Sequence, residues 1–222
     1  MYNGVPSIPE SDLAQAASED PEGLQMARRA EQEGPYGARF VTLRNGVTVR
    51  LRPIRPDDAS RLIALGGRLS PRTLYQRFFT VRTLRPEEAA ALSRVDGHDR
   101  VAIVVDRGPG GPDDLLAVAR YGVAGDDPAP EIALVVDDAW QGQGLGSILL
   151  DELLRVGSAR GFATFRADVL AENRRMLRLL ARFGTFVERS SEQGVVTILL
   201  RPRPEPLGSP ARAQSSSPAS AA

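Results

Sequence analysis

Two chemically useful residue types are missing from this 222-residue chain: it has no cysteine, and its 28 basic residues are all arginine, so it has no lysine. The lack of cysteine excludes a disulfide scaffold, a cysteine nucleophile and a thiolate metal site. Histidine occurs once, as His98, which excludes metal centres and acid–base pairs built from several histidines. The bias toward arginine has an ordinary explanation in GC-rich coding.

The chain also lacks a charge excess and long apolar runs. Its 28 acidic and 28 basic residues give a formal net charge of zero, which argues against a protein that binds nucleic acid by neutralising phosphates. No apolar run approaches the roughly 20 residues that span a membrane. Residues 1–10 lack the charged start and apolar core of a signal peptide. We therefore expect a cytoplasmic protein with neither a membrane nor a nucleic-acid partner.

Composition divides the chain into three parts. Residues 1–40 show little hydrophobic pattern and predict a flexible segment, with one short helix near 21–33. Residues 202–222 contain five Pro, five Ser and five Ala, which predicts a disordered tail because so few apolar groups cannot offset the entropy of ordering. Residues 41–201 remain as a single domain of common size.

Strand-like and helix-like stretches alternate within that domain. Alternating or continuous apolar residues predict strands at 47–54, 101–105, 115–123, 132–136, 164–169, 185–189 and 195–200. Capping residues and prolines predict helices that begin near 56, 70, 86, 145 and 173. The order indicates an α/β domain, a mixed twisted sheet of about six or seven strands flanked by helices.

The most informative stretch is a glycine-rich turn between a strand and a helix, Trp140-Gln141-Gly142-Gln143-Gly144-Leu145-Gly146. Glycines allow close approach of the backbone to a ligand, and the helix start adds positive partial charge, so the turn suits a pyrophosphate. A nucleotide-triphosphate loop is excluded because that loop needs a lysine. Dinucleotide binding is disfavoured because the spacing is Gly-x-Gly-x-Gly and no acidic ribose ligand ends a following strand.

The turn fits the pattern Gln/Arg-x-x-Gly-x-Gly/Ala and so resembles the GNAT superfamily of acyl-CoA-dependent N-acetyltransferases. The flanking Leu134-Val135-Val136-Asp137-Asp138-Ala139, Glu172-Asn173-Arg174-Arg175-Met176 and Arg182-Phe183-Gly184 are similar to family segments. Residues 70–79 and 96–102 resemble the catalytic domains of bacterial Pat-type protein lysine acetyltransferases. The resemblance covers about residues 47–200 and implies a GNAT-like fold.

The resemblance also implies acetyl-CoA as co-substrate and no metal. It places the pantetheine arm along one strand, the pyrophosphate in the glycine-rich turn, and a further contact at a residue that is also a helix cap. The implied cofactor-binding residues are Leu134, Val135, Val136, Gln141, Gly142, Gln143, Gly144, Leu145, Gly146, Ser147 and Asn173.

Acetyl transfer to an amine needs a group that removes a proton, because a lysine side chain has a pKa near 10.4. A positioned carboxylate typically contributes roughly 10²–10⁴-fold. Glu131, at the start of the strand that leads into the turn, is the candidate base, and GNAT protein acetyltransferases place a glutamate similarly. His98 is a weaker candidate base, and Tyr75 is expected to pack in the core.

One departure from the family leaves alternatives open. Many GNAT enzymes have a tyrosine that protonates the leaving thiolate, and the matching position here is Leu180. The favoured function is acetyl transfer to a protein lysine by direct attack, in a monomer or homodimer. A small-molecule amine acetyltransferase and a non-catalytic acyl-CoA-binding regulatory module are the alternatives.

Overall fold

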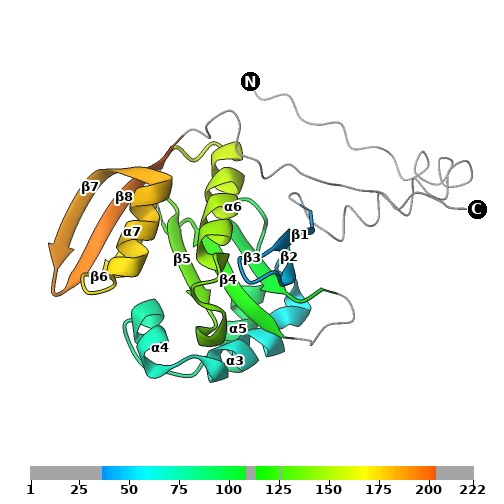
Figure 1. Ribbon diagram of the computed structural model, residues 1–222. Coiled ribbons are helices and arrows are strands. Elements are labelled where there is room, and N and C mark those ends of the chain that lie inside the picture. Colours follow the sequence, from blue (N-terminus) through cyan, green and yellow to red (C-terminus); the bar gives the residue numbers. More distant parts are fainter. Residues whose placement is uncertain (1–36, 109–113, 126, 204–222) are drawn as a thin grey trace, which may run out of the picture.

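A single mixed sheet of eight strands forms the centre of the computed structural model, which describes residues 37–108, 114–125 and 127–203 (Figure 1). The strands are β1 (Arg39–Thr42), β2 (Thr48–Pro53), β3 (Arg100–Asp106), β4 (Leu115–Gly122), β5 (Glu131–Val136), β6 (Phe165–Leu170), β7 (Gly184–Glu192) and β8 (Val195–Pro202). The helices are α3 (Ala59–Arg68), α4 (Pro71–Phe78), α5 (Pro86–Ser93), α6 (Leu145–Ala159) and α7 (Arg174–Phe183), with short 3₁₀ turns η1 (Pro56–Asp58) and η2 (Asp138–Trp140).

The strand order is β1-β2-β3-β4-β5-β6-β8-β7. All neighbouring pairs are antiparallel except β5 and β6, which are parallel and are connected through α6. The α/β class and the mixed sheet are thus confirmed. The sheet has eight strands because β1, a four-residue strand too short to show a clear alternation, joins the seven that the pattern indicates.

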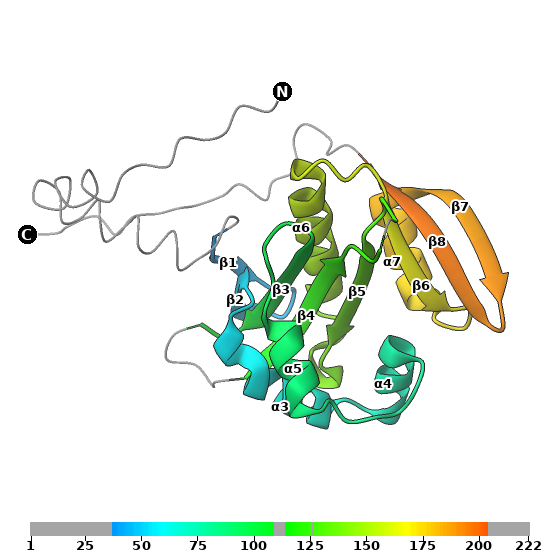
Figure 2. The same cartoon turned by 180° about the vertical axis from the view of Figure 1, so that it is seen from behind.

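Each face of the sheet has its own apolar core. One core packs α6 and α7 on one face, with Leu149, Leu153 and Leu180 fully buried. The other packs α3, α4 and α5 on the opposite face through Leu65, Leu74 and similar side chains (Figures 1 and 2). The site described below lies where elements of both layers meet.

Two of the predicted helix starts have the expected caps. The Ser70 hydroxyl accepts a hydrogen bond from the Thr73 amide at 3.2 Å, and Pro71 is the first residue of α4. The Asn173 side chain accepts from the Met176 amide at 3.1 Å at the start of α7. These contacts satisfy amides that a helix leaves without internal partners. The helix predicted near 21–33 lies outside the described residues.

The predicted tails lie mostly outside the described part of the chain. Residues 39 and 40 belong to β1, and Pro202 ends β8. Within the described ranges, no helix has the length and apolar character needed to cross a membrane.

Candidate active site

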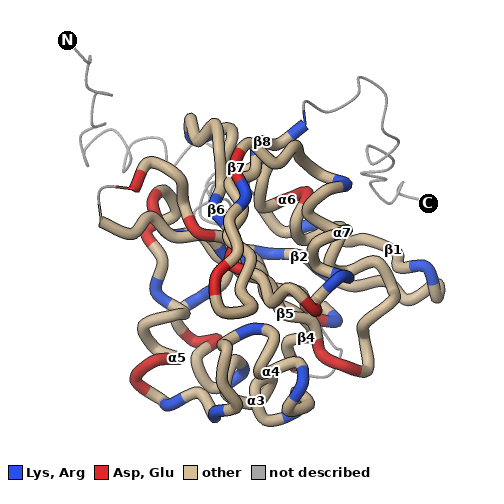
Figure 3. The backbone as a smooth tube through the Cα atoms, turned by 90° about the vertical axis from the view of Figure 1, so that its left-hand side faces the viewer, with Lys and Arg blue, Asp and Glu red and all other residues tan. Residues whose placement is uncertain are grey.

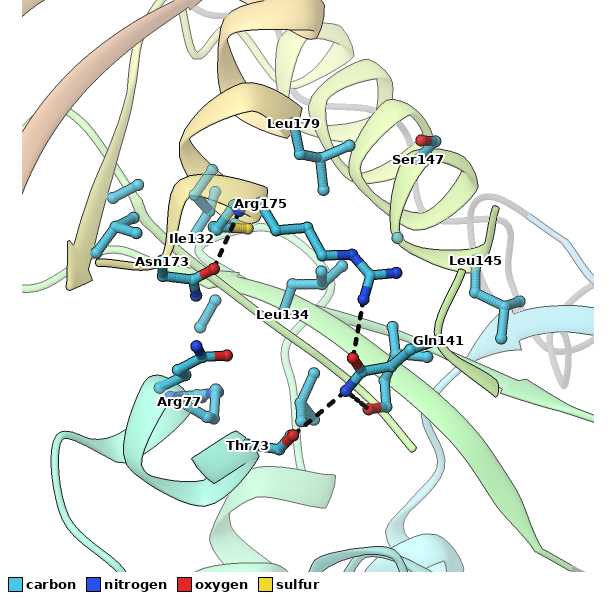
Figure 4. Close-up of a pocket in the computed structure, with 18 of the residues that line it drawn as sticks. Thr73, Arg77, Ile132, Leu134, Gln141, Leu145, Ser147, Asn173, Arg175 and Leu179 are labelled. Atoms are coloured by element: carbon cyan, nitrogen blue, oxygen red, sulfur yellow. Dashed lines mark hydrogen bonds between the residues drawn. The ribbon is translucent and has the colours of Figure 1, made fainter. Parts of the chain in front are cut away.

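The parallel strands β5 and β6 share one register pair, Glu131 with Arg166, and then diverge toward α4 (Figure 2). A cavity of about 690 Å³ lies along this divergence. Its walls are β5, β6, α4, α7 and the glycine-rich turn, and Figure 4 shows side chains from these elements directed into it. Because strands in a sheet normally satisfy one another's backbone groups, the divergence leaves a strand edge facing the cavity.

The exposed edge of β5 presents backbone groups to an extended ligand. The Arg166 amide donates to the Pro130 carbonyl at 2.9 Å, so the backbone groups of Pro130 point toward β6. Backbone groups alternate sides along a strand, so those of Leu134 and Val136 also point into the gap. These are the positions that the resemblance assigns to the pantetheine arm. Val135, between them, is buried against the α3–α5 layer.

The glycine-rich turn needs glycine at two of its three glycine positions. Gly142 has φ +83° and Gly144 has φ +100°, values that residues with a Cβ rarely adopt. Gly144 is the N-cap of the 15-residue helix α6 and has no side chain to occupy the first amides of that helix. Those amides therefore stay available to an anion. A Cβ at Gly146 would make ordinary contacts of 3.5–3.6 Å with Leu179 and Leu134, in keeping with the Gly/Ala choice of the pattern.

Gln141 connects three walls of the cavity (Figure 4). Its Nε2 donates to the Thr73 hydroxyl at 3.3 Å and to the Val136 carbonyl at 3.2 Å. Its Oε1 accepts from Arg175 Nη1 at 3.0 Å. The turn is thus fixed to α4, to β5 and to the start of α7.

The two acids before the turn are occupied by structural hydrogen bonds. Asp137 accepts from the Ala139 amide and from Arg68 Nε. Asp138 accepts from the Ser70 amide and from the Thr73 hydroxyl. Burial works against ionisation of Asp138, but these hydrogen bonds outweigh it and hold its pKa below the usual range. These contacts are those expected of acids that orient the glycine-rich turn.

The structure places the candidate bases differently. The side chain of Glu131 is exposed and lines the cavity at the start of β5. His98 does not line it: its Nδ1 lies 2.8 Å from Asp99 Oδ1, and its ring packs near Phe162. Glu131 is thus the candidate base that reaches the site.

The expectation that Tyr75 packs in the core is wrong. Tyr75 is 44% exposed rather than packed in the core, because α4 turns Leu74, one residue earlier, toward the sheet. On α7, Leu180 is fully buried in the core, and Met176 and Leu179 line the cavity. Since α7 contains no residue with a hydroxyl group, this helix supplies no hydroxyl group that could protonate a thiolate.

Sequence reasoning missed the arginines that line the cavity. Figure 3 shows basic segments on α4 and beside α7, and the cavity-lining members are Arg44, Arg77, Arg175, Arg178 and Arg182. The spacing of the last three along α7 places them near one helix face, a signal that was available in the sequence. The positions of Arg44 and Arg77 depend on tertiary packing and gave no such signal.

The comparisons with known proteins agree with this geometry. The model of the acetyltransferase (GNAT) family matches residues 70–185. This chain belongs to the GNAT family. The matching model is that of an acetyltransferase family.

Individual GNAT relatives refine this assignment. Acetyltransferase Pat of Mycolicibacterium smegmatis is 34% identical over 157 residues, which are 70% of this chain and 46% of that protein. The crystal structure of the GNAT domain of S. lividans PAT matches with a TM-score of 0.65 and 32% identity, over 74% of this chain and 96% of that one. A cAMP-binding acyltransferase from Mycobacterium smegmatis matches with a TM-score of 0.51 and 29% identity, over 74% and 47% of the two chains. The GNAT chain described here thus spans about half the length of its Pat relative.

Proposed function

We propose that this GNAT acetyltransferase moves the acetyl group of acetyl-CoA to the side-chain amine of a protein lysine, with Glu131 as general base. The observation that carries the proposal is the position of Glu131 on the strand whose free edge lines the cavity and leads into the glycine-rich turn. Base and donor site are therefore positioned by one strand. Similarity to Pat and to the GNAT domain of S. lividans PAT supports a protein acceptor.

The chain's own residues suit the parts of acetyl-CoA. The edge of β5 at Leu134 and Val136 offers backbone groups to the amide-bearing pantetheine arm, with Val135 between them. The turn from Gln141 to Ser147 offers amides and a helix start to the pyrophosphate. Arg44 and Arg175 flank that turn: a Cβ on Gly144 would lie 3.9 Å from Arg44 Nε, and one on Gly142 would lie 4.0 Å from Arg175 Nη2. Asn173 lines the same cavity.

A protonated lysine side chain loses two protons as it becomes an amide. Glu131 accepts the first, which leaves a neutral amine. The amine nitrogen then bonds to the acetyl carbon, the carbon–sulfur bond breaks, and the second proton passes from the nitrogen to the released thiolate, directly or through water, since α7 supplies no hydroxyl group. Binding of both substrates in one cavity supplies the proximity that makes the attack efficient.

Replacement of Glu131 by Gln tests the assignment of the base. We expect Glu131→Gln to lower kcat roughly 10²-fold or more at pH 7, because the amide cannot accept the proton, with unchanged affinity for CoA. Release of the CoA thiol, with candidate proteins as acceptors, measures turnover, and calorimetric titration measures CoA binding. Glu87→Gln, an exposed glutamate on α5 outside the cavity, is the matched control. Equal turnover of Glu131→Gln and wild type would rule out Glu131 as the base.

A further inference from the structure

Two arginines on the same side of the sheet as Glu131 form no close ion pair within the described part of the chain. Arg77 of α4 lines the main cavity and also a small adjoining hollow of about 40 Å³, and Arg120 of β4 lines that hollow. Among the described residues, no carboxylate lies within 4.0 Å of either guanidinium group. Arg120 donates one hydrogen bond, from Nη2 to the Leu92 carbonyl at 3.1 Å.

Strand register brings these charges close to the proposed base. In the β4–β5 ladder, Arg120 pairs with Ala133, and Gly122 pairs with Glu131. Paired residues share a face and side chains alternate along a strand, so Arg120 and Glu131 are diagonal neighbours on one face, roughly 7–8 Å apart. Helix α4, which carries Arg77, contacts β5. Arg77 and Glu131 therefore line the main cavity, and Arg120 lies beside them in the adjoining hollow.

The electrostatics around these three residues favour an incoming anion. Burial lowers the pKa of Arg77, and the charge of Glu131 only partly opposes this effect. Burial, together with the charges of Arg77 and Arg100, lowers the pKa of Arg120 to about 10. Partly buried like charges are unfavourable unless an opposite charge binds between them. In contrast, the buried Arg52 is fully paired with Asp58 and Asp106.

We propose that Arg77, supported by Arg120, binds a carboxylate of the acceptor beside the lysine that is acetylated. This proposal rests on the proposed function. It predicts that the preferred acceptor is a peptide segment in which an Asp or Glu lies close to the acetylated lysine. Arginine suits this role because its planar group forms two parallel hydrogen bonds to a carboxylate.

Peptides that differ in one residue test the preference. Acetyl-capped, amidated lysine peptides would carry Asp at each position from three before to three after the lysine, each paired with an Asn peptide. For at least one position we expect kcat/KM of the full chain to be about tenfold or more higher with Asp, the size of a hydrogen bond to a charged group. Arg77→Met should reduce this ratio to about one, and Arg120→Met should reduce it partly. Arg72→Met, on the exposed side of the same helix, should keep the wild-type ratio.

Several results would overturn the carboxylate site. One is equal kcat/KM for every Asp and Asn pair in wild type. Another is a decrease in kcat/KM of Arg77→Met that is the same for the Asp peptide and its Asn partner, since Arg77 would then act only through Glu131. Competition by free glutamate without competition by any Asp peptide would also overturn it, because the recognised carboxylate would belong to a small amine.

Failure of the proposed function can be distinguished from failure of the carboxylate site. If no lysine peptide is acetylated, the proposed function fails, and fluorescence anisotropy of the same peptides with CoA present still tests the arginines. Tighter binding of an Asp peptide than of its Asn partner, lost in Arg77→Met and kept in Arg72→Met, supports the carboxylate site. Equal binding of both peptides overturns it.

Discussion

Individual residues of the glycine-rich turn carry backbone conformations that few other residues tolerate. Gly144 has φ +100° and also begins α6, so its conformation sets the direction of the first amides of the helix. A Cβ there would meet nothing closer than Arg44 Nε at 3.9 Å. Any penalty for substitution at Gly144 therefore comes from the backbone and not from crowding.

We expect Gly144→Ala to weaken CoA binding about tenfold and to lower the free energy of unfolding by about 1–2 kcal/mol, because alanine is strained at positive φ. Calorimetric titration with CoA and urea unfolding measure the two effects. Gly194→Ala is the matched control, since Gly194 has φ +82° in the β7–β8 turn, away from the cavity. It should lose similar stability and keep CoA affinity. Equal CoA affinity in wild type and Gly144→Ala would contradict this view of the turn.

At the scale of elements, the β1–β2 hairpin brings a basic residue to the turn. Arg39 of β1 donates to Glu152 of α6 at 2.7 Å, which joins the edge strand to the helix that follows the turn. In the hairpin loop, the Arg44 amide lies 3.5 Å from the Gln143 carbonyl, and its side chain lines the cavity. The hairpin therefore places a positive charge where the proposed function places phosphate groups.

Removal of that charge should weaken CoA binding and its dependence on salt. We expect Arg44→Met to raise the Kd for CoA about threefold to tenfold at low salt, with a smaller difference at 1 M salt because exposed charges are then screened. Titrations at both salt concentrations measure this. Arg189→Met, on the exposed edge strand β7, should bind CoA like wild type. A loss that is the same at both salt concentrations would show that Arg44 acts by packing and not by charge.

The elements also show which features the sequence could predict. Strands, capped helices and the turn come from local patterns, and Glu131 reaches the site because it lies on the strand before the turn. The exposure of Tyr75 could not be predicted in this way, because it depends on the rotation of α4 about its axis, and one position along a helix turns a side chain by about 100°. Arg44 and Arg77 come from the hairpin loop and from α4, whose positions depend on long-range packing.

At the scale of the whole molecule, a buried ionic network joins the early strands to η1, which leads into α3. Arg52 is 2% exposed and donates to both oxygens of Asp58 and to Asp106. Asp106 also accepts from Arg50. Burial disfavours the Asp106 carboxylate, but hydrogen bonds from Arg50, Gly108 and Arg52 outweigh this and lower its pKa to about 2. The network is remote from the cavity, whose lining includes none of these residues.

This network makes the stability of the domain depend on pH in the acid range. An aspartate in the unfolded chain has a pKa near 3.9, above the folded value of about 2 for Asp106. The ionised form therefore stabilises the fold fully above about pH 4, and this contribution is lost as the pH falls toward 2. The difference corresponds to a free energy on the order of 2 kcal/mol.

Replacement of Asp106 by Asn separates this contribution from others. At pH 7 we expect Asp106→Asn to lower the free energy of unfolding by about 3 kcal/mol, because Arg52 loses a charged partner within the core. The difference from wild type should shrink as the pH falls from 4 to 2.5, since the unfolded wild-type chain then binds a proton at Asp106 and the stabilising effect of the charge declines. Urea unfolding at pH 7, 4 and 2.5 measures it, and Glu192→Gln, at the exposed end of β7, is the control with no change. A difference that stays constant across these pH values would show that Asp106 contributes by its hydrogen bonds or shape and not by its charge.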